Sequence, residues 1–595
     1  MKETTSRPNK NITNNAWALP WWKRQQLERQ GCSATDWDTV LINPACDISR
    51  IRNVDFIGNV KIGVINPEES AGSEIRNATI ENCEIGDAPR IRNINGSIRN
   101  AVIGNEVVIE NVARITFEPE ALCGIGIHVN VLDETGSRPV VIYPGINAQE
   151  ATLMAREPRL AEETLIPQVL SYIEAMPASN RIGDRSVIKD CGPIRNVAVG
   201  EEVTIEGARC LANGTVINNA ASGRPLAYIG SGVDADGFII EDGVVESGAL
   251  IRNCYIGQGA RLEKGFTAHD SLFFANCSME NGEACALLAG PYTVSMHKGT
   301  LLIGAQTSFM NAGSSTNQSN HMYKLGPVHW GILERGVKTA SNSYLMHGAA
   351  IGAFSLLMGS HKTHPNSTEF PFSYLFGDAQ GATVVVPAVM LRSCGLMRDE
   401  MKWPTRDRRL KRKLPLNDRI VFEVLNPYTV SRILTALETI AELLKLPADD
   451  DRFIRYKGMK ISKASLERAK NLYTLAVFKY LSNKLPEEGF PEKETENSEV
   501  AAQEWIDLAG QIMPRKILDQ AWEADSVEEH EAIFNQAFEG YSDMETEWIM
   551  ARFDEPWRVS PEQIKTMAQE FDALVEEDRN NYRDAIFAEN EMLKL

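Results

Sequence analysis

Positive charge is scarce in this chain of 595 residues. It has 61 Lys and Arg against 80 Asp and Glu, which gives a net charge of −19 at pH 7. Binding to nucleic acid depends on an excess of Lys and Arg that neutralises phosphates. The composition therefore excludes a general nucleic-acid binder.

Long apolar runs and paired cysteines are also missing. No apolar stretch is long enough to cross a membrane, and the polar residues 1–15 lack the apolar core of a signal peptide. The ten cysteines contain no Cys-x-x-Cys pair, which is typical of a reducing compartment. We expect a cytoplasmic protein without a membrane span, and more than one domain because the chain is several times the usual domain length.

A short phrase recurs along the chain: Ile-Arg-Asn, followed within a few residues by Ile-Gly or Val-Gly. It begins at Ile51, Ile75, Ile98, Ile194 and Ile251. Such repetition indicates a solenoid, in which short strands each send one aliphatic side chain inward. Gly and Asn suit the corners between strands because both tolerate a positive φ. Ile85-Gly86 and Ile103-Gly104 are 18 residues apart, which is three hexapeptides, or one triangular coil of a parallel β-helix.

The pattern is interrupted once and then replaced. It stops near Ala113, gives way to helical spacing from about residue 148 to 176, and resumes at Ile188. Helical periodicity returns after Pro404, and Ser560-Pro561-Glu562-Gln563 has the form of a capping box that opens a long helix. The predicted fold is mainly a β solenoid with a helical insertion and an α-helical C-terminal domain. Its parts are a helical cap over 1–40, solenoid over 41–113, the insertion over 114–185, solenoid over 186–400 and the helical domain over 401–595.

Histidine is concentrated in one segment, since seven of the nine lie between His269 and His364. A neutral imidazole can act as a general base near pH 7. His329 and His347 are 18 residues apart, so we expect them to stack on one face and take them as the first candidates for the base, followed by His321 and His297. The residues predicted to bind substrate are Asn311, Asn317, Asn320, Asn342, His361 and His364. The alternative is that these histidines form ladders or fill polar corners.

Two further patterns bear on ligands. His361-x-x-His364, joined by His321 or His329, has the residue types of a zinc site, but the segment has few carboxylates and no recognised spacing, so we predict no metal. Positive charge gathers between residues 402 and 413. One interpretation is a solvated basic linker. The other is a binding site for the phosphates of a nucleotide or of coenzyme A, formed by Arg406, Arg408, Arg409 and Lys411.

The Ile-Gly coils resemble those of the left-handed parallel β-helix acyltransferases of the hexapeptide-repeat type, such as UDP-N-acetylglucosamine acyltransferase. The chain is also similar to an uncharacterised bacterial family of long β-helix proteins. The resemblance implies left-handed coils, a trimer, a histidine base and an acyl-CoA or acyl-carrier donor, with no tightly bound cofactor. This sequence departs from that pattern in its degenerate hexapeptides, its insertion and its large helical domain.

Three hypotheses about function follow. The first is a transferase that moves an acyl group to a nucleotide-linked or phosphorylated sugar. The second is a non-enzymatic protein that binds such a sugar or serves as a scaffold. The third is a metal-dependent hydrolase or isomerase.

Overall fold

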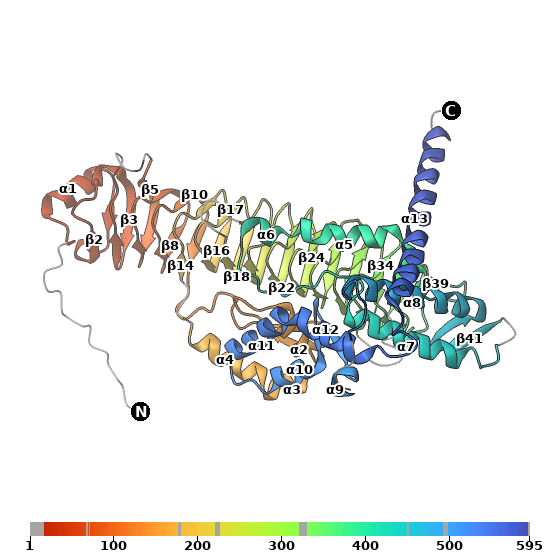
Figure 1. The fold of residues 1–595 in the computed structure, drawn as a ribbon. Helices are drawn as coiled ribbons and strands as arrows, with labels where there is room; N and C mark the ends of the chain where they lie inside the picture. The colour runs from red at the N-terminus through yellow and green to blue at the C-terminus, as the bar shows by residue number, and fades with distance from the viewer. Residues whose placement is uncertain are drawn as a thin grey trace, which may run out of the picture. The chain divides into compact units, whose positions relative to one another are not determined.

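The structure is a computed structural model, and its helices and strands carry the labels of Figure 1. It describes residues 17–66, 70, 72–176, 180–220, 226–319, 330–448, 452–491 and 498–592. The chain divides into two compact units. The N-terminal unit is Met1–Cys123, Ala178–Asn218 and Ala227–Asp236, and the C-terminal unit is Gly124–Pro177, Asn219–Leu226 and Gly237–Leu595.

The N-terminal unit begins with helix α1 (Trp21–Arg29), and its strands pair in parallel. One group of paired strands comprises β3 (Ile51–Ile57), β5 (Glu74–Glu81), β7 (Arg90–Ile94), β10 (Val108–Val112), β15 (Val187–Lys189), β17 (Thr204–Glu206) and β19 (Tyr228–Ile229). The register aligns one aliphatic residue from each strand, namely Ile51, Ile75, Ile91, Ile109, Ile188, Ile205 and Ile229, and all of them are buried.

Two further stacks complete this core. One aligns Ile80 of β5 with residues of β8 (Ser97–Arg99), β11 (Arg114–Thr116), β16 (Pro193–Val199) and β18 (Cys210–Ile217). The other runs through β2 (Val40–Ile42), β4 (Val60–Ile62), β6 (Glu84–Ile85), β9 (Val102–Ile103) and β14 (Arg181–Ile182). In it Ile85 pairs with Ile103, so the predicted step of 18 residues is confirmed at that place.

The corners of these strands explain the recurring asparagine. Asn53, Asn77, Asn100, Asn196 and Asn253, the last residues of the five Ile-Arg-Asn phrases, all have φ between 49° and 57°. Asn is one of the few residue types that adopts this left-handed region readily. The predicted positive φ of these asparagines is therefore confirmed. Ile91-Arg92-Asn93 is a sixth phrase, with Asn93 at φ 54°.

Three long stacks of strands in the C-terminal unit also pair in parallel, but the aligned residues change. One stack runs from Ile251 in β22 (Leu250–Ile256) through β24 (Thr267–Phe273), β26 (Glu283–Cys285), β29 (Leu301–Ile303), β32 (Asn317–Ser319), β35 (Tyr344–Met346) and β38 (Ser360–His361). A second runs from Ile256 through β27 (Leu288–Ala289), β30 (Ala305–Thr307), β33 (Gly331–Leu333) and β36 (Ala350–Ile351). A third runs through β23 (Arg261–Glu263), β25 (Ser278–Glu280), β28 (Val294–Ser295), β31 (Asn311–Ala312), β34 (Lys338–Thr339), β37 (Leu356–Met358) and β39 (Tyr374–Gly377). Polar residues enter these buried positions, as Gln318, Thr307, Ser295 and His361 show.

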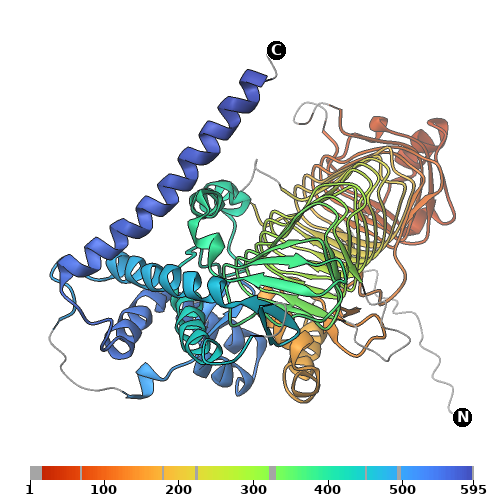
Figure 2. The ribbon, with the colours of Figure 1, turned by 90° about the vertical axis from the view of Figure 1, so that its right-hand side faces the viewer.

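Helices follow, as predicted for the C-terminal region. Their bounds are α5 (Cys394–Arg406), α6 (Arg408–Arg412), α7 (Pro427–Leu443), α8 (Lys463–Lys484), α9 (Ser498–Ala501), α10 (Arg515–Trp522), α11 (Val527–Glu539), α12 (Tyr541–Arg552) and α13 (Pro561–Met592). The capping box is confirmed, because Gln563 N donates to Ser560 Oγ and Ser560 N donates to Gln563 Oε1, each at 3.3 Å. Figures 1 and 2 both show α13 beside α8, a contact that extends to α5.

The region is not purely helical. It also contains β41 (Phe453–Tyr456), β42 (Met459–Ser462) and the hairpin of β43 (Trp505–Leu508) and β44 (Gln511–Pro514). Strand β42 pairs with β40 (Thr383–Val386), which precedes the helices. Helix formation starts at Cys394 rather than at 401.

The insertion shares a core with the C-terminal helices. It contains the hairpin of β12 (His128–Asn130) and β13 (Pro139–Val141), followed by α2 (Ala148–Arg156), α3 (Pro158–Glu163) and α4 (Leu165–Glu174). Met154 and Val169 are buried in the same cluster as Met513 and Phe534. Strand pairing lasts to Thr116 and resumes at Arg181, so the break is shorter than the predicted 114–185.

Candidate functional site

A charged cavity of about 350 Å³ lies in the C-terminal unit, and we call it the Arg335 cavity. Its wall combines strands β30, β33 and β36 with parts of α2, α7, α10 and the β43–β44 hairpin. The ionisable lining residues are Arg156, Glu157, Glu334, Arg335, Tyr428, Arg432, Glu504, Asp507 and Arg515. A cavity of this size that gathers so many charges from separate elements is a candidate ligand site.

Arg335 is fully buried in the turn that follows β33. Its guanidinium lies over the ring of Phe309, 4.9 Å from the centroid, and 5.8 Å from that of Phe354. Nη2 donates to the Val421 carbonyl at 2.6 Å, and Nε lies 3.8 Å from Asp507 Oδ2. Among the residues that the structure describes, Nε and Nη1 find no hydrogen-bond acceptor. A buried cation with unused donors is costly, and an anion bound there would relieve the cost.

Two carboxyl groups of the cavity have a raised pKa. Burial raises the pKa of Glu334, although Arg432 and the Tyr428 hydroxyl act in the opposite direction. Burial also raises the pKa of Asp507, against the effect of Arg335 and of the Gly510 N–H that donates to Asp507 Oδ1 at 2.7 Å. A carboxyl group that keeps its proton can donate a hydrogen bond to a ligand instead of repelling its negative charge.

The predicted histidines lie elsewhere, and none of those described lines this cavity. His361 is buried in the stack position that Leu345 occupies one strand earlier, and its Nδ1 lies 3.0 Å from Thr383 Oγ1. Burial lowers the pKa of His361 to about 4, so it is neutral at pH 7. His347 is buried, and its carbonyl accepts a hydrogen bond from His364 Nδ1. His297 is exposed after β28.

The remaining predicted residues are scattered. Asn311 and Asn342 are exposed, whereas Asn317 is half-buried opposite Tyr344 of the next strand. Asn320, His321 and His329 lie outside the described residues. The predicted stacking of His329 on His347 therefore stays a prediction.

The basic segment divides into two kinds of residue. Arg406 and Lys411 are exposed. Arg409 is only 2% exposed and pairs with Asp407 at 2.9 Å. Arg408 donates to the Gly259 carbonyl and, at 2.8 Å, to Ser278 Oγ. Arg408 and Arg409 therefore connect α6 to neighbouring segments. For the exposed Arg406 and Lys411, phosphate binding stays a prediction.

Metal binding has no visible support in the described part of the chain. No group of three or more His, Cys, Asp or Glu side chains is arranged there to hold an ion. His361 and His364 are two residues of the sequence pattern, but each ring nitrogen that bonds does so to a protein oxygen.

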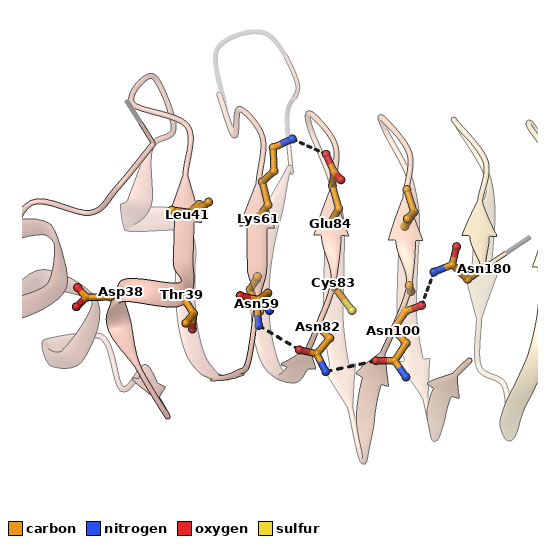
Figure 3. A pocket seen from close by; sticks show the side chains of 13 residues that line it. Asp38, Thr39, Leu41, Asn59, Lys61, Asn82, Cys83, Glu84, Asn100 and Asn180 are labelled. Atoms are coloured by element: carbon orange, nitrogen blue, oxygen red, sulfur yellow. Dashed lines mark hydrogen bonds and ion pairs between the residues drawn. The ribbon is translucent and has the colours of Figure 1, made fainter. Parts of the chain in front are cut away.

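A second hollow, of about 590 Å³, lies in the N-terminal unit (Figure 3). Its amides largely satisfy one another: Asn82 Oδ1 accepts from Asn59 N at 3.1 Å, and Asn82 Nδ2 donates to Asn100 Oδ1 at 3.4 Å. Lys61 and Glu84 form an ion pair of 2.5 Å across the same hollow. Because these groups already have partners, the hollow is a weaker candidate than the Arg335 cavity.

Sequence reasoning missed the Arg335 cavity. The available signal was the charged pair Glu334-Arg335, which directly follows the strand Gly331–Leu333 and precedes Gly336. Its partners Val421 and Asp507 are 86 and 172 residues further along the chain, so no local pattern could show the burial.

Comparison with known proteins gives family matches without an activity. Residues 22–444 match the family described as "Domain of unknown function (DUF4954)", and residues 491–593 match "Domain of unknown function (DUF6819)". An uncharacterised protein of Treponema pallidum (strain Nichols) is 26% identical over 445 residues, which cover 69% of this chain and 59% of that protein. Within the described residues, no helix has the length and apolar character needed to cross a bilayer.

Proposed function

We propose that the Arg335 cavity binds a small polar molecule carrying a phosphate or carboxylate group. The chain belongs to the family described as "Domain of unknown function (DUF4954)". The observation that carries this proposal is the buried Arg335 guanidinium with two unused donor nitrogens. Arginine recognises such oxyanions through paired, charge-assisted hydrogen bonds. The buried carboxyl groups of Glu334 and Asp507, together with Gln306, whose Oε1 is buried without a partner in the described chain, would contact the hydroxyl groups of a sugar.

The volume of the cavity limits the size of the ligand that it can hold. About 350 Å³ is near the lower end of the range for small-molecule sites. A phosphorylated monosaccharide or a sugar acid suits it better than a larger nucleotide-linked sugar. We therefore place the phosphorylated sugar first.

The test is ligand-induced stabilisation. Thermal unfolding of the full chain is followed with inorganic phosphate, glucose 6-phosphate and glucuronate. A ligand present at 100 times its Kd stabilises by about 2.7 kcal/mol. Arg335→Lys keeps the positive charge but loses the planar pair of N–H donors of the guanidinium, so we expect it to weaken binding at least tenfold.

The matched control is Arg515→Gln at the edge of the cavity, where the side chain is 54% exposed and lies 3.6 Å from Glu504. Binding that persists in Arg335→Lys and disappears in Arg515→Gln would refute the assignment. So would an absence of stabilisation by all three compounds. Unfolding of each variant without ligand shows whether it is folded.

A second proposal is acyl transfer to such a sugar, by left-handed coils of the hexapeptide-repeat type that assemble as trimers. It is supported by the 18-residue step between the paired Ile85 and Ile103. The donor would be acyl-CoA, and the exposed His297 is the base that solvent and substrates can reach among the described candidates. We expect release of free CoA from acetyl-CoA in the presence of amino or nucleotide sugars, and its loss in His297→Ala. Sugar binding without any release of CoA would favour the non-enzymatic function, and a monomer in light scattering would exclude the trimer.

A further inference from the structure

A groove of about 730 Å³ crosses strands β8, β11, β16 and β18 of the N-terminal unit, and we call it the Arg99 groove. The parallel register pairs Thr116 with Arg99 on one side and with Arg195 on the other. Residues paired in this way point to the same face, and neighbouring strands are roughly 4.8 Å apart. The two arginines therefore flank the Thr116 hydroxyl at a separation of roughly 10 Å along the groove. Arg114 adds a third guanidinium to the lining.

The positive charge of this groove is only partly neutralised. Arg195 Nη1 lies 3.6 Å from Glu118 Oε1. In the described chain no carboxylate lies within ion-pair distance of Arg99 or Arg114, and Arg99 Nε is buried without an acceptor. The groove's other acid, Asp236, accepts a hydrogen bond from Asn213 Nδ2 at 2.9 Å.

The Ile-Arg-Asn phrase also contributes arginines on another face, and their ion-pair partners differ from those in the groove. Arg52 pairs in register with Arg76, and Arg76 with Arg92. Glu74 forms ion pairs with Arg76, at 3.4 Å, and with Arg92. Glu110 lies 3.5 Å from Arg92. In this ladder Arg76 and Arg92 thus have acidic partners and Arg52 donates to the Ser49 carbonyl at 3.0 Å, whereas the Arg99 groove has one acidic partner, Glu118.

We propose that the Arg99 groove binds an oxyanion, the phosphate or carboxylate group of a polar small molecule, between Arg99 and Arg195 and over Thr116. Each guanidinium offers a planar pair of N–H donors, and the hydroxyl supplies a third kind of donor between them. The groove is open, so its anion remains partly hydrated and its affinity falls with salt. This site is independent of the Arg335 cavity, which belongs to the other unit.

Isothermal titration of the full chain tests the site with three probes: inorganic phosphate, pyrophosphate and citrate. The double variant Arg99→Gln, Arg195→Gln should bind the preferred probe at least tenfold more weakly than the wild type. The matched control Arg52→Gln, Arg76→Gln removes the same charge from the neighbouring ladder and should leave the affinity within twofold. Preference for the phosphates identifies a phosphate ester as the ligand class, and preference for citrate identifies a carboxylate.

Several outcomes would overturn the inference. These are equal losses in the two double variants, which would indicate general electrostatic attraction, and binding of none of the probes by the folded wild type. Arg335→Lys serves as a third arm. Loss of probe binding in that variant, with retention in the groove variant, would assign the anion to the Arg335 cavity and reject this site.

Discussion

The two units use the same parallel pairing but fill their stacks differently. In the N-terminal unit the aligned residues are almost all Ile, Leu or Val. In the C-terminal unit polar residues take such positions and bond to one another: Thr307 Oγ1 lies 2.9 Å from Thr293 Oγ1, and Thr339 Oγ1 lies 2.6 Å from Thr316 Oγ1. A buried hydroxyl is tolerated where a neighbouring strand supplies its partner. Parallel strand pairing therefore continues where the aliphatic repeat is no longer regular in the sequence.

Charge follows the same division. The ion pairs of the N-terminal unit include Lys61–Glu84, with side chains 44% and 52% exposed. Those of the C-terminal unit include the Arg409–Asp407 pair, with side chains 2% and 1% exposed. Exposed pairs contribute little to stability, whereas breaking a buried pair leaves a charge without water or counter-ion.

The largest expected effect comes from breaking the buried pair. Asp407→Ala leaves the Arg409 guanidinium buried without its counter-ion and should lower the free energy of unfolding by about 3–5 kcal/mol. Glu84→Ala, which breaks the exposed pair with Lys61, should cost at most about 1 kcal/mol. Urea unfolding of both variants measures the two losses. Equal losses would remove the distinction between the units.

The second effect depends on pH and concerns Glu150 in the first turn of α2. Its Oε2 accepts a hydrogen bond from the Tyr143 hydroxyl at 2.5 Å, and burial raises its pKa from 4.5 to about 7. Because the folded pKa exceeds the unfolded one, the folded state holds the extra proton between these values. Its contribution to stability is thus complete below pH 4.5 and is lost as the pH rises to about 7, by up to about 1.4 kcal/mol per pH unit.

Glu150→Gln keeps an acceptor for Tyr143 and removes the titration. We expect it to be more stable than the wild type at pH 8 and to show a smaller decline between pH 4.5 and 7. Glu150→Asp retains a carboxyl group and serves as the control. Parallel pH profiles for the wild type and Glu150→Gln in urea unfolding would refute the effect.

The smallest effect concerns a corner of the N-terminal unit. Asn77 has a φ of 50°, accepts from Asn53 Nδ2 at 3.1 Å and donates to Asn93 Oδ1 at 3.0 Å. Asn77→Ala loses both bonds and strains the backbone, at a cost of about 1–2 kcal/mol. Asn77→Gly restores the backbone freedom and should recover part of that loss. If glycine were no better than alanine, the corner geometry would not explain the asparagine.

Local chemistry accounts for what could be predicted. The 18-residue step, the positive φ of the asparagine corners and the cap at Ser560 each depend on residues close in sequence or repeated at a constant interval. The histidine segment was a weaker guide. His361 occupies a core position and His347 is buried, so their clustering reflects the polar filling of the stacks as much as any chemistry.

The parallel strands, the asparagines with positive φ and the helical C-terminal region could be predicted from the sequence, because they depend on residue types that recur along the chain or lie close together in it. The positions of buried charge without hydrogen-bond partners depend on how distant segments pack together. Arg335 follows the short strand β33 and Arg99 ends the short strand β8, and each keeps at least one buried donor nitrogen without an acceptor in the described segments. Such an imbalance is a property of all the neighbours together, which no stretch of sequence contains.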